Sequence, residues 1–183
     1  MGAATGEKFV KTYFSRHLAL IATAMILPFS ALAEPPGDPA PVKQDEIGVW
    51  HDKNGDPTYK IEGGKLDFSA YSGFRRYHSE CHVCHGPDGE GSTYAPALKT
   101  SLKTIGYAEF FGIVVGGRQN VANGNNNVMP AFADNKNVVC YLNDIYVYLR
   151  ARSNESLERG RPQNHAAKSP EYDANETKCL AGG

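Results

Sequence analysis

Apolar residues recur at helical spacing in three stretches of the chain. The first stretch follows Asp67, which is placed as an N-cap, and its spacing predicts a helix of about four turns that runs directly into Cys81. Its apolar positions are Phe68, Tyr71, Phe74 and Tyr77. Gly73 interrupts this face and costs up to about 1 kcal/mol relative to Ala, unless another group packs closely against it. That cost indicates that something lies close to Gly73.

Two later stretches also predict helices. Residues 107–115 are mostly apolar, and Gly116 and Gly117 follow them and stop a helix. The strongest pattern runs from about Asn137 to Arg152. Its apolar stripe consists of Val138, Tyr141, Leu142, Ile145, Tyr148 and Leu149. Because this part of the chain shows no convincing strand pairs, we predict an all-α fold.

The flanking segments have other patterns. Residues 34–46 contain four prolines and few apolar groups, which predicts a flexible or loosely attached arm. Asn54 and Gly55 lie between two β-prone runs and predict a hairpin, because Asn-Gly favours tight turns. A calcium loop opening at Asp52 would need glycine at its sixth position and glutamate at its twelfth, where the chain has Pro57 and Gly63.

The first 33 residues have the pattern of a cleavable export signal. Basic residues up to Arg16 precede an apolar run from Leu18 to Leu27, and Ala31-Leu32-Ala33 provides a small-x-small cleavage site. The run is too short to span a bilayer comfortably, so we expect cleavage after Ala33 and no membrane span in the mature chain. We divide the chain into a signal peptide (1–33), an N-terminal arm and hairpin (34–66), a helical domain (67–152) and a polar, turn-rich C-terminal tail (153–183).

Net charge limits the choice of partner. Cleavage removes three of the 19 Lys and Arg residues and one of the 20 Asp and Glu residues. The mature chain then has 16 basic and 19 acidic residues, a net charge of about −3 with histidine neutral. Since no basic stripe is present, nucleic acid is excluded as a partner, whereas a mildly acidic face would suit a basic protein.

Residues 81–85 read Cys-His-Val-Cys-His, the pattern that attaches haem c. The two thiols add across the haem vinyl groups, and the adjacent histidine ligates the iron. A thioredoxin-like redox pair would need a strand before Cys81, where the sequence predicts a helix. A zinc site would need further closely spaced ligands, which the other two cysteines do not provide. We therefore predict one covalent haem c held by Cys81 and Cys84, with His85 on the iron.

Met129 is the candidate for the second axial ligand. Loss of the signal peptide removes Met1 and Met25 and leaves Met129 as the only methionine. It lies in a polar, turn-forming segment, an unusual place for a core methionine and a reasonable place for a ligand-presenting loop. A thioether opposite an imidazole favours ferrous iron and raises the reduction potential. A methionine that fills a gap in the core is the alternative for this residue. The other candidate ligands are His51, His78, His82 and His165.

Four motifs together resemble the class I cytochromes c, over about residues 67–152. They are Gly73-x-x-x-Tyr77-x-x-x-Cys81-x-x-Cys84-His85-Gly86, Ala95-Pro96-Ala97-Leu98, Met129-Pro130-Ala131-Phe132 and the terminal Tyr148-Leu149. The resemblance implies a monohaem cytochrome c fold in which the first and last helices cross at Gly73 and Tyr148. It also implies that the Pro96 carbonyl accepts a hydrogen bond from Nδ1 of His85, which would fix the ring and strengthen it as a donor to iron.

A narrower resemblance concerns the flanking segments. The N-terminal extension with Trp50, the count of four cysteines and the tail sequence Gly160-Arg161-Pro162 resemble methanol-metabolism cytochromes of the cytochrome cL type, in particular their lanthanide-dependent branch. This implies a periplasmic one-electron carrier and not an enzyme. Its donor would be a PQQ-dependent quinoprotein methanol dehydrogenase, and its acceptor a downstream cytochrome c that leads to an oxidase. Another quinoprotein alcohol dehydrogenase or a respiratory complex is the alternative donor.

Two other functions remain as alternatives. A haem-based gas-binding module would need an open sixth position on the iron, which Met129 argues against. A small haem peroxidase would place a histidine and often an arginine beside the open position, and of the arginines only Arg118 lies near Met129 in sequence.

The two remaining cysteines are Cys140 and Cys179. In an oxidising periplasm, two such thiols in a small domain usually pair. A bond between them would close a loop of about 40 residues, contribute about 4 kcal/mol in the chain-entropy model and tie the tail to the core. Two free thiols are the alternative, because the sequence does not show whether the Cα atoms come within bonding range.

Overall fold

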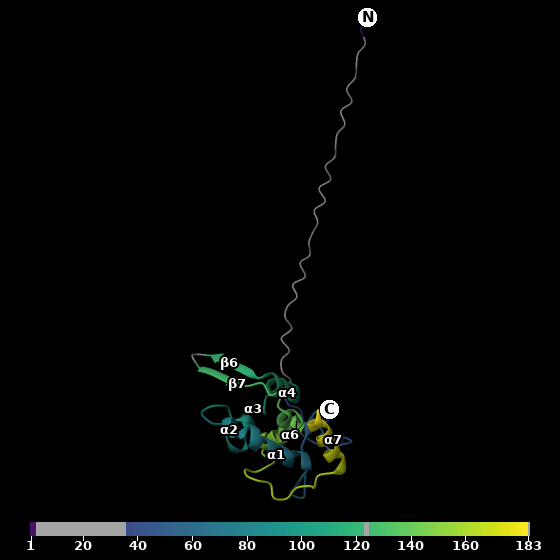
Figure 1. Ribbon diagram of the computed structural model, residues 1–183, viewed down its shortest axis with the longest axis vertical. Coiled ribbons are helices and arrows are strands. Elements are labelled where there is room, and N and C mark those ends of the chain that lie inside the picture. Colours follow the sequence, from purple (N-terminus) through teal and green to yellow (C-terminus); the bar gives the residue numbers. More distant parts are fainter. Residues whose placement is uncertain (3–35, 123–124, 183) are drawn as a thin grey trace. The chain divides into compact units, whose positions relative to one another are not determined.

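Helices make up most of the fold, and short antiparallel strands surround them. The computed structural model describes residues 1–2, 36–122 and 125–182, and those from residue 36 onward belong to one compact unit (Figure 1). The helices are α1 (Phe68–Glu80), α2 (His82–His85), the 3₁₀ helix η1 (Pro87–Gly89), α3 (Leu98–Ser101), α4 (Tyr107–Gly116), α5 (Lys136–Val139), α6 (Leu142–Ser153) and α7 (Pro170–Ala181). The strands are β1 (Lys43–Gln44), β2 (Trp50–His51), β3 (Pro57–Thr58), β4 (Ile61–Glu62), β5 (Lys65–Leu66), β6 (Arg118–Ala122) and β7 (Asn125–Met129).

Most of the predicted signal peptide, including its cleavage site after Ala33, lies outside the described residues. Within the described ranges, no helix is both long enough and apolar enough to cross a bilayer.

Helices α1 and α6 pack against each other at Gly73, as the resemblance implies. A Cβ atom on Gly73 would lie 1.9 Å from the backbone oxygen of Asp144 and 2.8 Å from Cβ of Tyr148. Only glycine allows the two backbones to come this close. Helix α1 begins where expected, because the Asp67 carboxylate accepts a hydrogen bond of 2.9 Å from the Ala70 amide.

The core lies on both sides of α6. The predicted stripe of residues 138–149 is buried throughout, and its members other than Tyr141 join Tyr77, Leu102, Phe110 and Val114 in one cluster. A second cluster, which includes Tyr59, Leu66, Ala70, Tyr71, Val147 and Ala151, lies under the N-terminal strands. Helix α6 is therefore buried on nearly all its faces, and it is the centre of the fold.

The prediction of a single helix over residues 137–152 is wrong. Helix α5 ends at Val139 with Cys140 as its C-cap, Tyr141 adopts the non-helical angles φ −124° and ψ 18°, and α6 starts at Leu142. Contacts with α7 account for the break. Cys140 is bonded to Cys179, and the Tyr141 hydroxyl donates to Glu176 at 2.6 Å. The apolar periodicity continues through the break, so the sequence pattern could not reveal it.

The prediction of a loosely attached arm is also wrong for residues 36–46. Strand β1 pairs with β2, and β2 pairs with β3 across the predicted hairpin, in one antiparallel sheet. Thr58 Oγ1 donates to the Pro39 carbonyl at 2.7 Å, and the buried Arg150 donates to the Gly37 carbonyl. Arg150 also forms an ion pair of 3.2 Å with buried Asp52. Because a buried guanidinium requires acceptors, it holds the proline-rich segment in place.

The C-terminal tail is more ordered than its composition predicts. Ser169 caps α7 by accepting a hydrogen bond of 3.0 Å from the Tyr172 amide, and Pro170 occupies the first helical turn. The disulfide between Cys140 and Cys179 is present, with Cα atoms 5.8 Å apart, and it ties α7 to α5. Ahead of α7, the ring of His165 stacks on Tyr71 at 3.4 Å between centroids.

The segment around Met129 is a strand, not the loop that its polar sequence predicts. Strands β6 and β7 form a hairpin in which Arg118 lies opposite Met129 and Ala122 opposite Asn125. Figure 1 shows the hairpin extending from the helical body. A short strand rich in asparagine has low β-propensity, and pairing with β6 overrides it.

Candidate haem site

The Cys-x-x-Cys-His motif forms the turn that follows α1. The Cys81 amide donates to the Tyr77 carbonyl at 2.9 Å and ends α1, and the His85 amide donates back to the Cys81 carbonyl at 3.0 Å. Cys81 and Cys84 are both free thiols, with Cys81 partly buried and Cys84 exposed. Burial raises the pKa of Cys81 to about 12, so this thiol is protonated at neutral pH.

His85 is buried and held in one orientation. Its Nδ1 lies 2.9 Å from the Pro96 carbonyl oxygen. A carbonyl oxygen only accepts, so Nδ1 carries the proton and Nε2 keeps its lone pair for a metal. The hydrogen bond implied by the sequence resemblance is therefore present in the structure.

Tight turns fix the loop between His85 and Pro96. The Gly91 amide donates to the His85 carbonyl at 2.7 Å, and a Cβ atom on Gly86, whose φ is +71°, would lie 2.2 Å from the Gly91 oxygen. The buried Tyr77 hydroxyl donates to the Gly86 carbonyl at 2.6 Å and accepts from the Gly89 amide at 3.1 Å. Tyr77 thus connects α1 to the turn that carries His85.

Met129 lies at the end of β7 and is half-buried. It packs against the same core cluster as Cys81. The base of the hairpin is joined to α4, because the Phe132 amide donates to the Val114 carbonyl at 3.0 Å. The position of the thioether is therefore set by α4 and by the strand register.

The four histidines that were alternatives to Met129 have partners elsewhere. His51 contacts Asp45 and the Gly55 carbonyl, each at 2.9 Å. His165 stacks on Tyr71. His78 and His82 face each other, with 3.1 Å between their Nδ1 atoms. These contacts favour Met129 as the second axial ligand.

The residues present fit haem c. The two thiols of Cys81 and Cys84 are free, and the buried imidazole of His85 has its Nε2 available. The half-buried thioether of Met129 packs against the same core cluster as Cys81. Cys140 and Cys179 are bonded to each other, so neither can complete a zinc site with Cys81 and Cys84. Among the described residues, no group of three or more His, Cys, Asp or Glu side chains is arranged to hold a metal ion.

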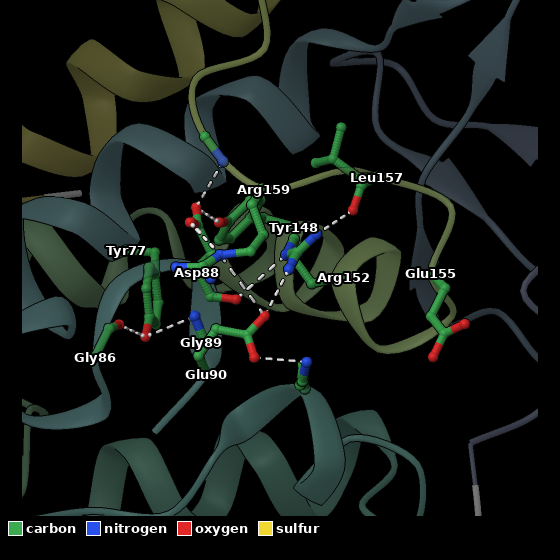
Figure 2. Close-up of polar contacts among 12 residues, drawn as sticks. Tyr77, Gly86, Asp88, Gly89, Glu90, Tyr148, Arg152, Glu155, Leu157 and Arg159 are labelled. Carbon is green, nitrogen blue, oxygen red and sulfur yellow. Dashed lines mark hydrogen bonds and ion pairs between the residues drawn. The ribbon is translucent and has the colours of Figure 1, made fainter. Parts of the chain in front are cut away.

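A polar network behind the motif was not predicted from the sequence. Its centre is Asp88, a buried residue with φ +56° three positions after His85. Its carboxylate accepts hydrogen bonds from the Tyr148 hydroxyl and the Gly160 amide, both at 3.2 Å, and lies 3.4 Å from Nε of Arg159. Figure 2 shows Tyr148 and Arg159 next to Asp88. Aspartate tolerates the left-handed conformation better than most residues, and this is the only local signal that the sequence offers.

Arginine and glutamate extend the network to the last helix. Arg152 donates to the backbone oxygen of Asp88 and to the Glu90 carboxylate, at 3.2 and 3.0 Å (Figure 2). A hydrogen bond from Lys99 is the largest cause that holds the pKa of Glu90 below its usual range, and the charges of Arg159 and Arg152 lower it further. The network connects the turn after His85 to α6 and to the tail near Gly160.

Comparisons with known proteins give the family. The chain is 54% identical to cytochrome c-553I of Paracoccus denitrificans over 138 residues, which cover 75% of this chain and 61% of that protein. It is 36% identical to cytochrome c-555 of Methylococcus capsulatus (strain Bath) over 96 residues, 52% of this chain and 72% of that protein. The crystal structure of the c-type cytochrome XoxG from Methylobacterium extorquens AM1 matches 81% of this chain and 99% of its own, with a TM-score of 0.67 and 49% identity.

No family model matches the chain. The match spans less than two thirds of the Paracoccus protein, but nearly all of the XoxG chain. The chain therefore belongs to the c-type cytochromes, electron-transfer proteins that carry covalently bound haem c.

Proposed function

We propose that this protein is a periplasmic one-electron carrier that accepts electrons from a PQQ-dependent quinoprotein methanol dehydrogenase and passes them to a downstream cytochrome c. The observation that carries the proposal is the 2.9 Å contact between His85 Nδ1 and the Pro96 carbonyl, which leaves Nε2 available to bind iron. Half-buried Met129, which packs against the same core cluster as Cys81, supports it. The similarity to XoxG and the methanol-metabolism resemblance of the flanking segments support this class of donor.

In this proposal, Cys81 and Cys84 attach the haem through thioether bonds, and His85 and Met129 are the axial ligands. The bound haem supplies the chemistry, a one-electron cycle between ferric and ferrous iron. Pro96 would hold the His85 ring in place, so this ligand would not have to reorient when the charge on the iron changes. The buried tyrosines and α6 keep water away from the inner side of the site.

The attachment motif lies at the protein surface. Cys84 is exposed, and Val83 beside it has 81% of its surface exposed. A donor that docks there would approach the covalently attached edge of the cofactor. A small, transient interface suits a carrier that must release its partner after each electron.

The donor is tested by stopped flow. Reduced methanol dehydrogenase is mixed with the oxidised cytochrome, haem reduction is followed, and the measurement is repeated over a range of ionic strength. We expect fast reduction whose rate changes with salt, because a physiological pair is steered by charge. Slow, salt-insensitive reduction by methanol dehydrogenase, with fast reduction by another quinoprotein alcohol dehydrogenase, would contradict the assigned donor.

The role as a carrier is tested separately with carbon monoxide. A protein with both axial positions filled binds this ligand slowly in the reduced state. Rapid binding at neutral pH would instead support a gas-binding module.

A further inference from the structure

The register of the β6–β7 hairpin places Arg118 directly opposite Met129. Residues that face each other across an antiparallel pair project to the same face of the hairpin. Met129 packs against the core from this face, whereas the next residue, Val128, points away and has 63% of its surface exposed. Arg118 therefore leaves the hairpin on the face that carries the thioether.

The base of the hairpin keeps this pairing fixed. Gly117 precedes Arg118 with φ +74°, and a Cβ atom there would lie 2.9 Å from both the Met129 oxygen and the Ala131 nitrogen. Only glycine fits such a position without strain. The backbones of Arg118 and Met129 are thus held opposite each other, and the two side chains start from the same face of the hairpin.

The charge of Arg118 is not neutralised by the part of the chain that the structure describes. The side chain is exposed, and no ion pair or hydrogen bond joins it to residues 36–119 or 128–182, whose side chains the structure describes. Other arginines on the same molecule differ, because Arg76, Arg150, Arg152 and Arg159 each face a carboxylate. A cation without a protein partner, on the same face of the hairpin as the candidate iron ligand, is suited to an anionic group of the cofactor.

We propose that Arg118 is a positioning residue of the haem site, whose guanidinium pairs with a haem propionate and whose charge raises the reduction potential. This inference rests on the proposed ligation by Met129. A guanidinium binds a carboxylate through two parallel hydrogen bonds, so it fixes the propionate more firmly than an ammonium does. The ferric state carries one more positive charge than the ferrous state, so a nearby cation disfavours it.

Redox titration of the haem-loaded protein tests this role. In Arg118→Gln, the equilibrium constant for reduction by a fixed reference couple should fall by threefold to tenfold, where tenfold corresponds to about 59 mV for one electron. In Arg118→Lys, the charge remains but the bidentate contact is lost, so the equilibrium constant for reduction should fall less than in Arg118→Gln. The potential of Arg118→Gln should also become more dependent on pH, because the unpaired propionate takes up a proton more readily.

The matched control moves the charge to the other face. Gln119 lies opposite Val128, on the outward face of the hairpin. The double variant Arg118→Gln/Gln119→Arg therefore keeps the net charge and moves the positive charge from the inner face to the outer face. Its potential should stay as low as that of Arg118→Gln. A potential restored by the double variant, or unchanged in Arg118→Gln, would overturn the role of Arg118.

The far-red charge-transfer band of Met-ligated ferric haem separates this inference from the proposed function. We expect the band in the wild type and in every Arg118 variant, since the arginine does not ligate the iron. Absence of the band from the wild type would contradict the ligation by Met129 itself. If the wild type and the Arg118 variants all keep the band and have the same reduction potential, only the role of Arg118 is contradicted.

Discussion

Gly73 of α1 lies against the backbone of Asp144 in α6, so close that a Cβ atom would be 1.9 Å from the carbonyl oxygen. The haem attachment motif is the direct continuation of α1, so this contact sets the position of Cys81 relative to the core. A shift of α1 against α6 would therefore also displace the attachment motif.

Gly73→Ala should lower the free energy of unfolding by at least about 2 kcal/mol, since the added methyl has to push two helix backbones apart. Urea unfolding of the haem-loaded protein measures the change. Gly112→Ala in α4 is the control, because a Cβ atom there meets nothing within 4 Å. The control should be neutral or slightly stabilising through better helix propensity. Equal effects at the two glycines would show that α1 and α6 are not in backbone contact.

The disulfide between Cys140 and Cys179 should stabilise the protein by about 4 kcal/mol in the chain-entropy model. The double variant Cys140→Ala/Cys179→Ala should lose this stability while keeping its haem spectrum. With the haem of both proteins already in the ferrous state, a disulfide reductant should destabilise the wild type and leave the double variant unchanged. Two titratable thiols beyond those of the haem motif in denatured, unreduced wild type would mean that the bond does not form.

Asp144 should make stability depend on pH. Burial raises the pKa of its carboxyl to about 7, although the Tyr172 hydroxyl donates to it. Below the unfolded pKa of 3.8, both states are protonated and the group has no effect. As the pH rises from there to about 7, the unfolded state loses the proton first, so folding becomes less favourable, by roughly 1.4 kcal/mol per unit of pKa difference.

Asp144→Asn should therefore be more stable than the wild type at pH 8, and the gain should shrink towards pH 4. Denaturant unfolding at a series of pH values measures it. Asp134→Asn, which changes an exposed carboxylate, serves as the control and should show no such trend. A gain that is the same at every pH would indicate that Asp144 is ionised or protonated throughout.

The ion pair between Arg150 and Asp52 holds the N-terminal segment and should show strong coupling. Their side chains are 1% and 0% exposed, so removing one partner leaves a buried charge unpaired. Arg150→Met and Asp52→Asn should each cost about 3–5 kcal/mol. The double variant should cost much less than the sum, in a double-mutant cycle measured by urea unfolding. Additive losses would mean that the two charges do not interact.

The sequence was informative where a local rule applies. The N-cap Asp67 depends only on neighbouring residues, and it appears as expected in the fold. The helix crossing at Gly73 joins residues about 70 positions apart and followed from the family resemblance. The hydrogen bond between His85 and Pro96, which are eleven positions apart, was predicted from the family resemblance and not from periodicity.

The contacts that sequence reasoning missed depend on distant partners. The break at Tyr141 is explained by α7, which lies about 35 residues away along the chain. The arm is held by Arg150, more than 100 positions away, and Asp88 accepts a hydrogen bond from the Gly160 amide, 72 positions away. Burial of polar groups against remote segments leaves no periodic signal in a single sequence.

The ligation by His85 and Met129 is the central claim, and the ferric absorption spectrum tests it most directly. Val128→Ala, which changes the neighbouring outward-facing residue, is the matched control for Met129→Ala. We predict that the far-red charge-transfer band is present in the wild type and in Val128→Ala, and that it is lost in Met129→Ala together with a lowered reduction potential. A band that survives in Met129→Ala would contradict the account.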